Sequence, residues 1–599
     1  MINRVGLGLG SFITLLGLTM GQVRAQSQSL FLSYPPNNYQ TTSPQIFFIG
    51  SAGADVTVTL NGQALQRSSQ GNFAPVLPLA IGENQFIFEA GDQRIERTIT
   101  RLATTPILPP NGGFAPDSLL PNQAISRLPN EPICFAAHRV ADLYEIVPTQ
   151  STVTVKLAEK TIPLTSQGQG VELPANNSLL YGQNQPVNTA SNRYEGCQTF
   201  ENPTATDLSL GSPQFTLQWQ GKTWTETAKG SVTLLDKNRP QVVAVTANPG
   251  VTRTGPSTDN SRLTPLPQGT QAAVTGSEGD WLRLDYGAWI KASETETLAS
   301  QVAPHSVIRS IGYQVFADRT ELRFPLQLPV PVAVQQMGDR LTLTLFNTTA
   351  QTDTIRLDND PILKNFTWQQ TNPDRIDYQF QFKTDQQWGY DLRYEGTTLI
   401  LSLRHPPQIP AKKGDLTGVK ILIDPGHGGS ESGSVGPTGY AEKDINLLIS
   451  LKLAEKLRAR GADIHLTRTT DEFVSLPDRV AQIAQVQPAI ALSIHYNALP
   501  DSGDPNSKQG ISAFWFQPQS QSLANFLQQS LVQKLKRPDD GVYFNSLAVV
   551  RPAIAPAVLL ELGYMINPQE FEWITDRQAQ TELVKVLDDS VTTWLWQQR

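Results

Sequence analysis

The sequence predicts a multidomain protein in which several all-β modules precede a C-terminal α/β domain with a mostly parallel twisted sheet. The chain has 599 residues, too many for one hydrophobic core, so about three to five domains are expected. Up to residue 405, short alternating runs are separated by turns; Pro and Gly number 43 each and charged residues make up only 17%, a balance typical of β modules. After Leu416, strand-like runs alternate with longer helical periods, which is typical of parallel βαβ units.

The first 25 residues have the pattern of a secretory signal peptide. Arg4 precedes an apolar run from Val5 to Met20, and Val23-Arg24-Ala25 places small residues before a cleavage point. A membrane anchor is the alternative, but the run is shorter than the roughly 18 apolar residues of a spanning helix. We therefore expect secretion across the inner membrane to the periplasm or cell envelope, with no membrane span.

Charge and cysteine content narrow the function further. The net charge of −7 gives no reason to expect nucleic acid, whose binding proteins carry clustered basic faces. Cys134 and Cys197 are the only cysteines, and in an oxidising compartment we expect them to form a disulfide that closes a loop of 197 − 134 = 63 residues. Two separately buried thiols are the alternative.

Short alternating runs divide the first half of the chain into β modules. Residues 29–103 resemble an immunoglobulin-like sandwich, and Asn61-Gly62 directly after a strand-like run predicts a hairpin turn. Residues 104–132 lack periodicity and are predicted to be a linker, whereas residues 133–240 are β-rich but of unknown type. Residues 241–296 contain GDWLRLDYGAWIKA and resemble a small barrel of the Src-homology (SH3-like) type, although most of these aromatic side chains simply fill a core.

Residues 417–599 are predicted to form one α/β domain, after a Pro- and Lys-containing linker at 406–416. The apolar runs predict strands near 418–423, 463–467, 489–494, 511–516 and 557–561. Helical periodicity predicts helices near 442–460, 475–486, 520–536 and 576–597.

Chemically active residues follow three of these strands. His427 lies in a Gly-rich loop after the first strand, His495 ends the third, and Glu561 ends the last. Ligands of open α/β sheets bind beyond the carboxyl ends of the strands, and Glu442 at the start of the first helix can reach the same edge. A carboxylate that ends a buried strand, as Glu561 does, is costly unless it is paired or works near a metal.

Each of these residues also has an ordinary structural explanation. A single histidine at a strand end is usually a hydrogen-bonded polar residue, and Glu442 could serve only to stabilise the helix dipole. The Gly-rich loop is not followed by Gly-Lys-Ser/Thr, and no Gly-x-Ser-x-Gly elbow occurs near these strands, which argues against a phosphate loop and a serine hydrolase. The convergence of all four residues on one edge favours a metal site.

The segments IDPGHGG, EKDINL, LTRTTDEFVSLPDR, SIHYNA and PAVLLELGYMINP occur in this order in the last third of the chain. They resemble the zinc-dependent N-acetylmuramoyl-L-alanine amidases, a family of bacterial cell-wall hydrolases. The resemblance implies one Zn²⁺ per catalytic domain and a catalytic carboxylate, with His427, Glu442 and His495 as metal ligands and Glu561 as the catalytic residue. Asp424, Arg479 and Asn497 also match motif positions, and we expect them to support the site or to contact substrate.

The same resemblance implies hydrolysis of the amide bond between N-acetylmuramoyl and L-alanine in peptidoglycan. Residues 306–405 resemble the AMIN type of domain that directs such amidases to the envelope or division site, so division-site proteins are expected partners. Two other functions stay open: a zinc peptidase that cuts within the stem peptide, and a non-catalytic scaffold that binds the wall. Two histidines and one glutamate also suit divalent ions other than zinc.

Overall fold

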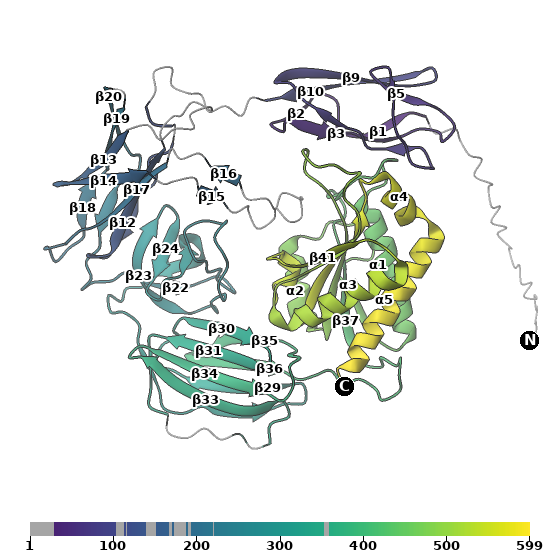
Figure 1. The fold of residues 1–599 in the computed structure, drawn as a ribbon. Coiled ribbons are helices and arrows are strands. Elements are labelled where there is room, and N and C mark those ends of the chain that lie inside the picture. The colour runs from purple at the N-terminus through teal and green to yellow at the C-terminus, as the bar shows by residue number, and fades with distance from the viewer. Residues whose placement is uncertain are drawn as a thin grey trace, which may run out of the picture.

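The computed structural model describes residues 29–102, 113–115, 117–138, 151–166, 170–172, 187–189, 193–219, 221–352, 357 and 359–599. The expected signal peptide, residues 1–25, lies outside these residues, as do residues 104–112 of the first expected linker. Figure 1 shows β modules followed by an α/β domain, which confirms the predicted fold class. In this view the α/β domain lies between the first β module, at the top, and the last, at the bottom.

The C-terminal domain is built on a six-stranded sheet with the order β38-β37-β39-β42-β40-β41. Neighbouring strands are parallel except for β40 and β42, so the sheet is mostly parallel, as expected. The buried apolar residues of its central strands explain their position between two layers of helices. The strands are β37 (Lys420–Pro425), β38 (Asp463–Leu466), β39 (Ile490–Asn497), β40 (Ile511–Trp515), β41 (Asp539–Phe544) and β42 (Ala557–Tyr564).

Helices cover both faces of this sheet. The helices α1 (Glu442–Ala459), α3 (Gln521–Leu535) and α5 (Arg577–Gln597) pack together on one face around the main hydrophobic core. The other face is covered by α2 (Leu476–Val486) and the 3-10 helix η3 (Ala548–Val550). The remaining helices are η2 (Pro518–Ser520) and α4 (Pro568–Thr575).

The predicted strands and helices of this domain are all present, with ends within a few residues of those expected. Three elements have no counterpart among the predictions: the strand β41, the short helix α4 and the 3-10 helix η3. The sequence of β41, DDGVYF, begins with two carboxylates and a glycine, and its side chains are at most half-buried at the sheet edge. Periodicity therefore gives little signal there.

The first β module consists of small sheets around one hydrophobic core. The predicted hairpin is present: Thr59 and Leu60 pair with Ala64 and Gln63 across a turn in which Asn61 and Gly62 both have positive φ, 50° and 81°. The strands are β1 (Phe31–Tyr34), β2 (Tyr39–Thr41), β3 (Gln45–Phe47), β4 (Ile49–Ser51), β5 (Val58–Leu60), β6 (Gln63–Ala64), β7 (Asn72–Phe73), β8 (Val76–Pro78), β9 (Gly82–Ala90) and β10 (Gln93–Arg101).

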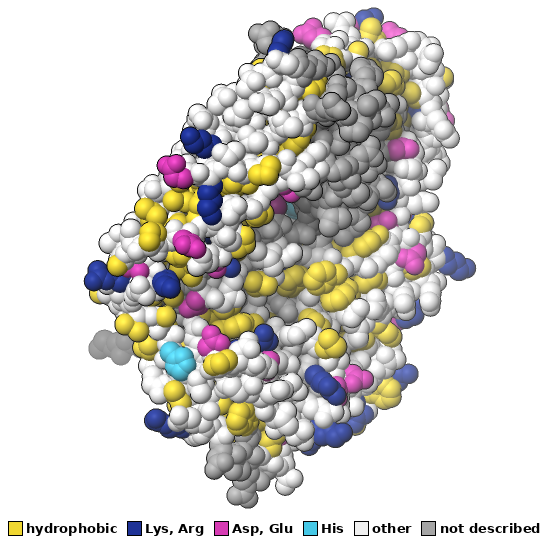
Figure 2. Space-filling view, turned by 60° about the vertical axis from the view of Figure 1, so that its left-hand side comes forward, with side chains coloured by type: hydrophobic (Ala, Val, Ile, Leu, Met, Phe, Trp, Pro, Cys, Tyr) yellow, Lys and Arg dark blue, Asp and Glu magenta, His cyan; other side chains and the backbone are white. Residues whose placement is uncertain are grey.

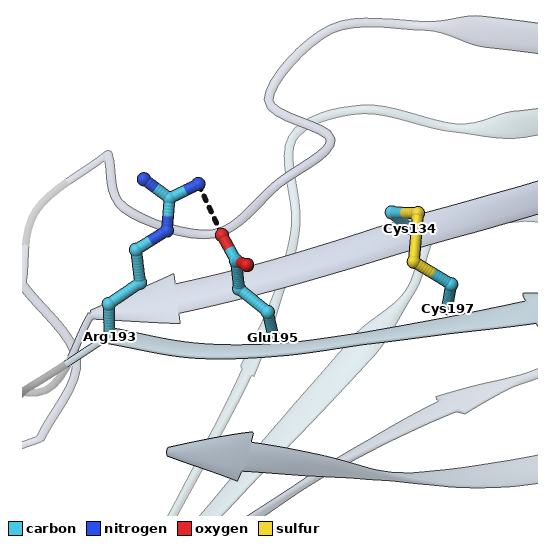
Figure 3. Close-up of a disulfide and its surroundings, with 4 residues drawn as sticks. All are labelled: Cys134, Arg193, Glu195 and Cys197. Atoms are coloured by element: carbon cyan, nitrogen blue, oxygen red, sulfur yellow. Dashed lines mark ion pairs between the residues drawn. A yellow bond between two sulfur atoms is a disulfide. The ribbon is translucent and has the colours of Figure 1, made fainter. Parts of the chain in front are cut away.

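The second β module contains the disulfide. Cys134 and Cys197 are direct register partners on neighbouring antiparallel strands, and their sulfur atoms are bonded. Figure 3 shows this bond, with Arg193 and Glu195 forming an ion pair further along the same strand as Cys197. The strands are β12 (Pro132–His138), β13 (Thr152–Leu157), β14 (Lys160–Ser166), β17 (Arg193–Thr199), β19 (Gln214–Trp219) and β20 (Lys222–Thr227), with β15 (Gly170–Glu172) and β16 (Val187–Thr189) as a separate pair.

One eight-stranded sheet crosses the domain boundaries that were expected at residues 132 and 240. The strand β11, inside the expected linker 104–132, lies between β21 and β23, and its Ile125 is buried. Three residues are too few for periodicity to reveal, and the partners of β11 are distant in sequence. The strands are β11 (Ile125–Arg127), β18 (Leu208–Gly211), β21 (Val232–Leu234), β22 (Val242–Val245), β23 (Gln271–Glu278), β24 (Trp281–Leu284), β25 (Trp289–Lys291) and β26 (Thr295–Thr297), with the 3-10 helix η1 (Ala292–Glu294) before β26.

Residues 306–405 form two four-stranded sheets and a short strand pair. Their hydrophobic core is continuous with that of residues 241–296, where Leu284 and Ile290 belong to the same cluster as Leu322 and Phe324. The strands are β27 (Ser306–Ile308), β28 (Gly312–Val315), β29 (Arg319–Pro325), β30 (Val332–Met337), β31 (Arg340–Phe346), β32 (Thr348–Ala350), β33 (Leu363–Asn372), β34 (Arg375–Phe382), β35 (Tyr390–Glu395) and β36 (Thr398–Arg404).

This last β module is attached to the α/β domain by packing and by hydrogen bonds. The indole of Trp388 lies 5.7 Å from that of Trp594, within the main core of the α/β domain. Arg404 donates hydrogen bonds to the carbonyl groups of Gln487, Pro488 and Ile554. On the face drawn in Figure 2, acidic and basic side chains are interspersed. In the described part of the chain, no helix combines the length and apolar character needed to cross a bilayer.

Candidate metal centre

The predicted site residues lie at the carboxyl ends of three neighbouring strands. Because β37, β39 and β42 are parallel, these ends meet at one edge of the sheet. His495 on β39 is the register partner of Glu561 on β42. His427 follows β37 by two residues, and Glu442 is the first residue of α1. The fold therefore brings all four residues to the same edge.

Three of these side chains converge on one point. One ligand atom from each of His427, Glu442 and His495 lies within 4.8 Å of the others. Oε1 of Glu442 is 3.3 Å from Nε2 of His427 and 3.0 Å from Nδ1 of His495. The two imidazole rings meet edge to face, with their centroids 4.9 Å apart. This is the donor set and the spacing that a single divalent ion requires.

Glycines leave the space that these side chains occupy. A Cβ atom on Gly426 would overlap the ring of His495, and one on Gly433 would overlap the carboxylate of Glu442. His427 has a φ of 58°, in the left-handed region that non-glycine residues rarely adopt. Strained backbone of this kind persists where the surrounding structure enforces it, and it is frequent at functional sites.

The Glu442 carboxylate is held by neutral donors as well as by the histidines. Its oxygen atoms accept hydrogen bonds from the backbone N–H groups of Ser434, at 2.8 Å, and Tyr496, at 3.1 Å, and from Nδ2 of Asn446, at 3.2 Å. Burial favours the neutral acid, but the hydrogen bonds from both histidines outweigh it and lower the pKa of Glu442. The carboxylate in turn raises the pKa of His427, although burial acts against this.

Glu561 lies beside this cluster in a different environment. Its side chain is buried, and Oε2 has no hydrogen-bond partner among the described residues. Burial raises the pKa of Glu561, and the nearby carboxylates of Glu442 and Asp540 raise it further. Two adjacent carboxylates therefore have pKa values shifted in opposite directions, which is how acid and base roles are separated in an active site.

Comparison with known proteins agrees with this geometry. Residues 421–593 match the profile of a family described as N-acetylmuramoyl-L-alanine amidase. The C-terminal domain belongs to this family. The upstream modules lie outside the matched residues.

Relatives of the amidase domain include two staphylococcal proteins named as probable cell wall amidase LytH. The protein of Staphylococcus epidermidis strain ATCC 12228 is 34% identical over 178 residues, which cover 29% of this chain and 58% of the relative. That of Staphylococcus aureus is 34% identical over 182 residues, covering 30% and 60%. The chain thus spans less than two thirds of the length of these curated relatives. A solved N-acetylmuramoyl-L-alanine amidase from Clostridium difficile 630 is 32% identical, with 30% of this chain and 96% of that one covered and a TM-score of 0.28.

A buried ion pair anchors the loop of the amidase domain that carries His427. Nη1 of Arg479 pairs with Asp424 and donates to the carbonyl of Pro425, while Nη2 donates to the carbonyl of His427 at 2.7 Å. Asp424 also accepts hydrogen bonds from Thr467 and Ser493. Although burial favours the neutral acid, Arg479 and these hydroxyl groups lower the pKa of Asp424. The two predicted support residues therefore position the ligand loop.

We expect Arg479→Met to destabilise this loop strongly, because it leaves the Asp424 carboxylate buried without its partner. Breaking a buried pair in this way costs about 3–5 kcal/mol. Hydrogen–deuterium exchange of the β37 and β39 amides should report a lowered free energy of opening, and Arg577→Met, on the exposed surface of α5, is the matched control. Unchanged exchange in Arg479→Met would contradict this role.

Asn497, the third predicted support residue, belongs to a chain of polar side chains that continues away from the ligands. Its Nδ2 donates to the hydroxyl of Tyr564 at 3.2 Å, and that hydroxyl donates to Oδ2 of Asp540 at 2.8 Å. The chain links the ends of β39 and β42 to the edge strand β41. Tyr564 lies in the segment PAVLLELGYMINP, but no sequence signal links it to Asp540.

Arg468 is a further residue that the sequence-based site prediction missed. Its guanidinium group donates to the carbonyl oxygens of Pro425, Gly426 and Lys443, so it ties the loop after β37 to the first turn of α1. It lies in the motif LTRTTDEFVSLPDR, eleven residues before Arg479. The second arginine of that motif was the available sequence signal, whereas the backbone carbonyl groups that it contacts are visible only in the fold.

Proposed function

We propose that the C-terminal domain is a zinc-dependent amidase that hydrolyses the bond between N-acetylmuramoyl and L-alanine in peptidoglycan. The observation that carries this proposal is the convergence of three ligand atoms within 4.8 Å of one another, beside a buried carboxylate with an unpartnered oxygen. The family description of the domain and the names of its relatives support the choice of bond.

The donor set fits a catalytic metal. His427, His495 and Glu442 would supply three protein ligands, the number typical of catalytic zinc sites, whereas structural zinc sites have four. Gly426 and Gly433, which leave room for the side chains of His495 and Glu442, also support a metal site. Zinc held by these residues would polarise a carbonyl group and lower the pKa of water to about 7.

Glu561 has the properties of the proton acceptor. Burial and the nearby carboxylates raise its pKa above that of an ordinary glutamate, which makes it a stronger base, and its Oε2, which has no hydrogen-bond partner among the described residues, is available to a water molecule. In the proposed reaction Glu561 takes a proton from the attacking water and passes it to the departing amine of L-alanine. The two histidines lower the pKa of Glu442 despite its burial, so that it stays ionised and suits a metal ligand rather than the proton acceptor.

The bond that is cut can be identified by mass spectrometry of fragments released from peptidoglycan by the full-length protein with zinc. We expect free lactyl carboxylates on the muramic acid and stem peptides that begin with L-alanine. Fragments in which muramoyl-alanine is intact would instead identify a peptidase acting within the stem peptide and would refute the amidase proposal.

The acid limb of the pH profile provides a further test. Glu561 must be ionised to accept a proton, so kcat/KM rises with pH through its raised pKa. Asp540→Asn removes one of the charges that raise this pKa, and we therefore expect the acid limb to shift to lower pH. The control is Asp539→Asn, at a neighbouring exposed carboxylate. An acid limb that stays in place or shifts upward in Asp540→Asn would contradict the assignment.

The same shift predicts a stability effect. The folded-state pKa of Glu561 lies above its unfolded value, so folding takes up a proton between the two values. Its contribution to stability is therefore present at low pH and is lost as the pH rises through the folded-state pKa.

We further propose that the protein works in the periplasm or cell envelope, with the β modules as the route to division-site partners. The disulfide between Cys134 and Cys197 supports an oxidising compartment, and the relatives are named as cell wall amidases. Sequencing the N-terminus of the protein recovered from the envelope tests the expected cleavage after Ala25.

A further inference from the structure

The first β module is seated on the edge of the amidase domain that carries the site. Phe47 and Ile49 form a buried cluster with Tyr564, the last residue of β42, and with Ile566, two residues beyond it. On the neighbouring loop, Asp501 accepts hydrogen bonds from the hydroxyl groups of two tyrosines of the module, Tyr34 and Tyr39.

Further contacts extend this interface on both sides. Gln45 donates to the carbonyl of Ser502 at 2.6 Å, and Asn506 donates to that of Ala74 at 2.7 Å. The carboxylate of Glu572 accepts from the backbone N–H of Gln70 at 2.7 Å. The module is thus attached to the segments that follow both β39 and β42.

A shallow cavity of about 530 Å³, wide open to solvent, lies at the surface of this interface, between residues 41–44 of the module and residues 499–502 of the amidase domain. Its volume is within the range of about 300–1,000 Å³ that is usual for binding sites of small molecules. Leu499 follows His495 by four residues, so the chain between them spans at most about 14 Å. One wall of the cavity is therefore within about 14 Å of the proposed reaction centre.

The lining of the cavity suits an uncharged, hydroxyl-rich ligand. Thr41, Thr42, Ser43 and Ser502 contribute to it, together with prolines and Leu499, and its described lining residues include no Lys or Arg. The single carboxylate, that of Asp501, is already engaged by Tyr34 and Tyr39. A stem peptide carries carboxylates that favour basic partners, whereas a saccharide presents neutral hydroxyl and amide groups.

We propose that this cavity binds the sugars of the glycan strand next to the muramoyl residue that is cleaved. The inference rests on the proposed function, because the scissile bond lies on a side branch of a glycan that continues in both directions. The strand must then pass along the edge of the sheet, where the first β module provides a second wall. Neither domain forms this site without the other, so the module acts as a substrate-binding part of the enzyme.

The test compares full-length variants on two substrates. One is a glycan strand of several disaccharides that carries stem peptides, and the other is an N-acetylmuramoyl-L-alanyl peptide without flanking sugars. Thr42 is exposed at the cavity, and Thr42→Trp would fill it. We expect KM for the strand to rise about tenfold with kcat unchanged, because binding outside the reacting group is lost, and no change with the short substrate.

Gln63→Trp is the control. It places the same bulk on β6, at the opposite edge of the sheet from β2, and should behave as the wild type. An unchanged KM for the strand in Thr42→Trp, or an equal change with both substrates, would overturn the proposal.

A binding experiment separates this inference from the proposed function. Calorimetry measures the affinity of the zinc-free full-length chain for glycan strands from which the peptides have been removed. Affinity that is lost in Thr42→Trp but kept in Gln63→Trp supports the saccharide site even if no substrate is cleaved, in which case only the amidase proposal fails. Stripped strands that do not bind the wild type, while the peptide-bearing strand is cleaved, would overturn the saccharide site alone.

Discussion

Glu561→Gln is expected to lower kcat by about 10²–10⁴-fold, the usual contribution of a positioned general base. Glutamine occupies the same space but cannot take a proton from water. Metal content, measured by mass spectrometry of the purified protein, should be unchanged because the three ligand side chains remain. The rate of peptide release from peptidoglycan measures the loss.

The stability of this variant provides an independent check. The Glu561 carboxylate is buried and lies near the carboxylates of Glu442 and Asp540, and no described residue forms a hydrogen bond with its Oε2. Removing its charge should therefore leave the free energy of unfolding unchanged or increase it, as is common where a site is built for activity. The control is Glu455→Gln, on the exposed face of α1. Wild-type activity in Glu561→Gln would refute the proposed role.

Removal of the metal should have an effect at least as large. A catalytic metal contributes several kcal/mol to transition-state stabilisation, so treatment with a chelator is expected to lower activity by about a thousandfold or more. Adding zinc to the chelated protein should restore activity. His495→Ala should bind zinc weakly and stay inactive when zinc is added, since it lacks one of the three ligands.

His465→Ala is the matched control for that variant. His465 lies on β38 in the same domain, but its partner is Asp463, at 3.3 Å, and it is not one of the three converging ligands. It should retain both metal and activity. Full activity in a chelated protein that contains no metal would refute the metal-dependent mechanism.

The predictions from sequence succeeded where the signal is local. A buried strand needs a continuous apolar run and a surface helix needs its 3.6-residue period, so the elements that carry His427, Glu442, His495 and Glu561 were recognisable in order. The rule that parallel strands present their carboxyl ends at one edge then placed these residues together. The motifs of a known family added the ligand and base roles, which periodicity does not provide.

Local sequence patterns could not predict which strands pair when they are distant in the chain. The strand β11 is only three residues long and is stabilised by partners that are distant in the chain. The segment around Ile125 has the composition of a linker, so no local pattern revealed this strand. Asp540 lies near Glu561 because β41 pairs with β40, and the short, polar sequence of β41 gives no period that predicts this pairing. Arg468 donates to backbone carbonyl groups. Because every residue has a carbonyl group, the sequence does not indicate which of them Arg468 contacts.

The amino-acid sequence was sufficient to predict which side chains meet at the edge of the sheet, because the order of strands and helices can be recognised from local patterns. Only the folded chain determined what surrounds them: the ion pair of Asp424 and Arg479 behind the ligand loop, the carboxylates that raise the pKa of Glu561, and the β module seated on the edge of the sheet. These features depend on contacts between residues up to several hundred positions apart, such as Tyr34 and Asp501. Such contacts form only when apolar surfaces such as those of Phe47 and Tyr564 are buried together.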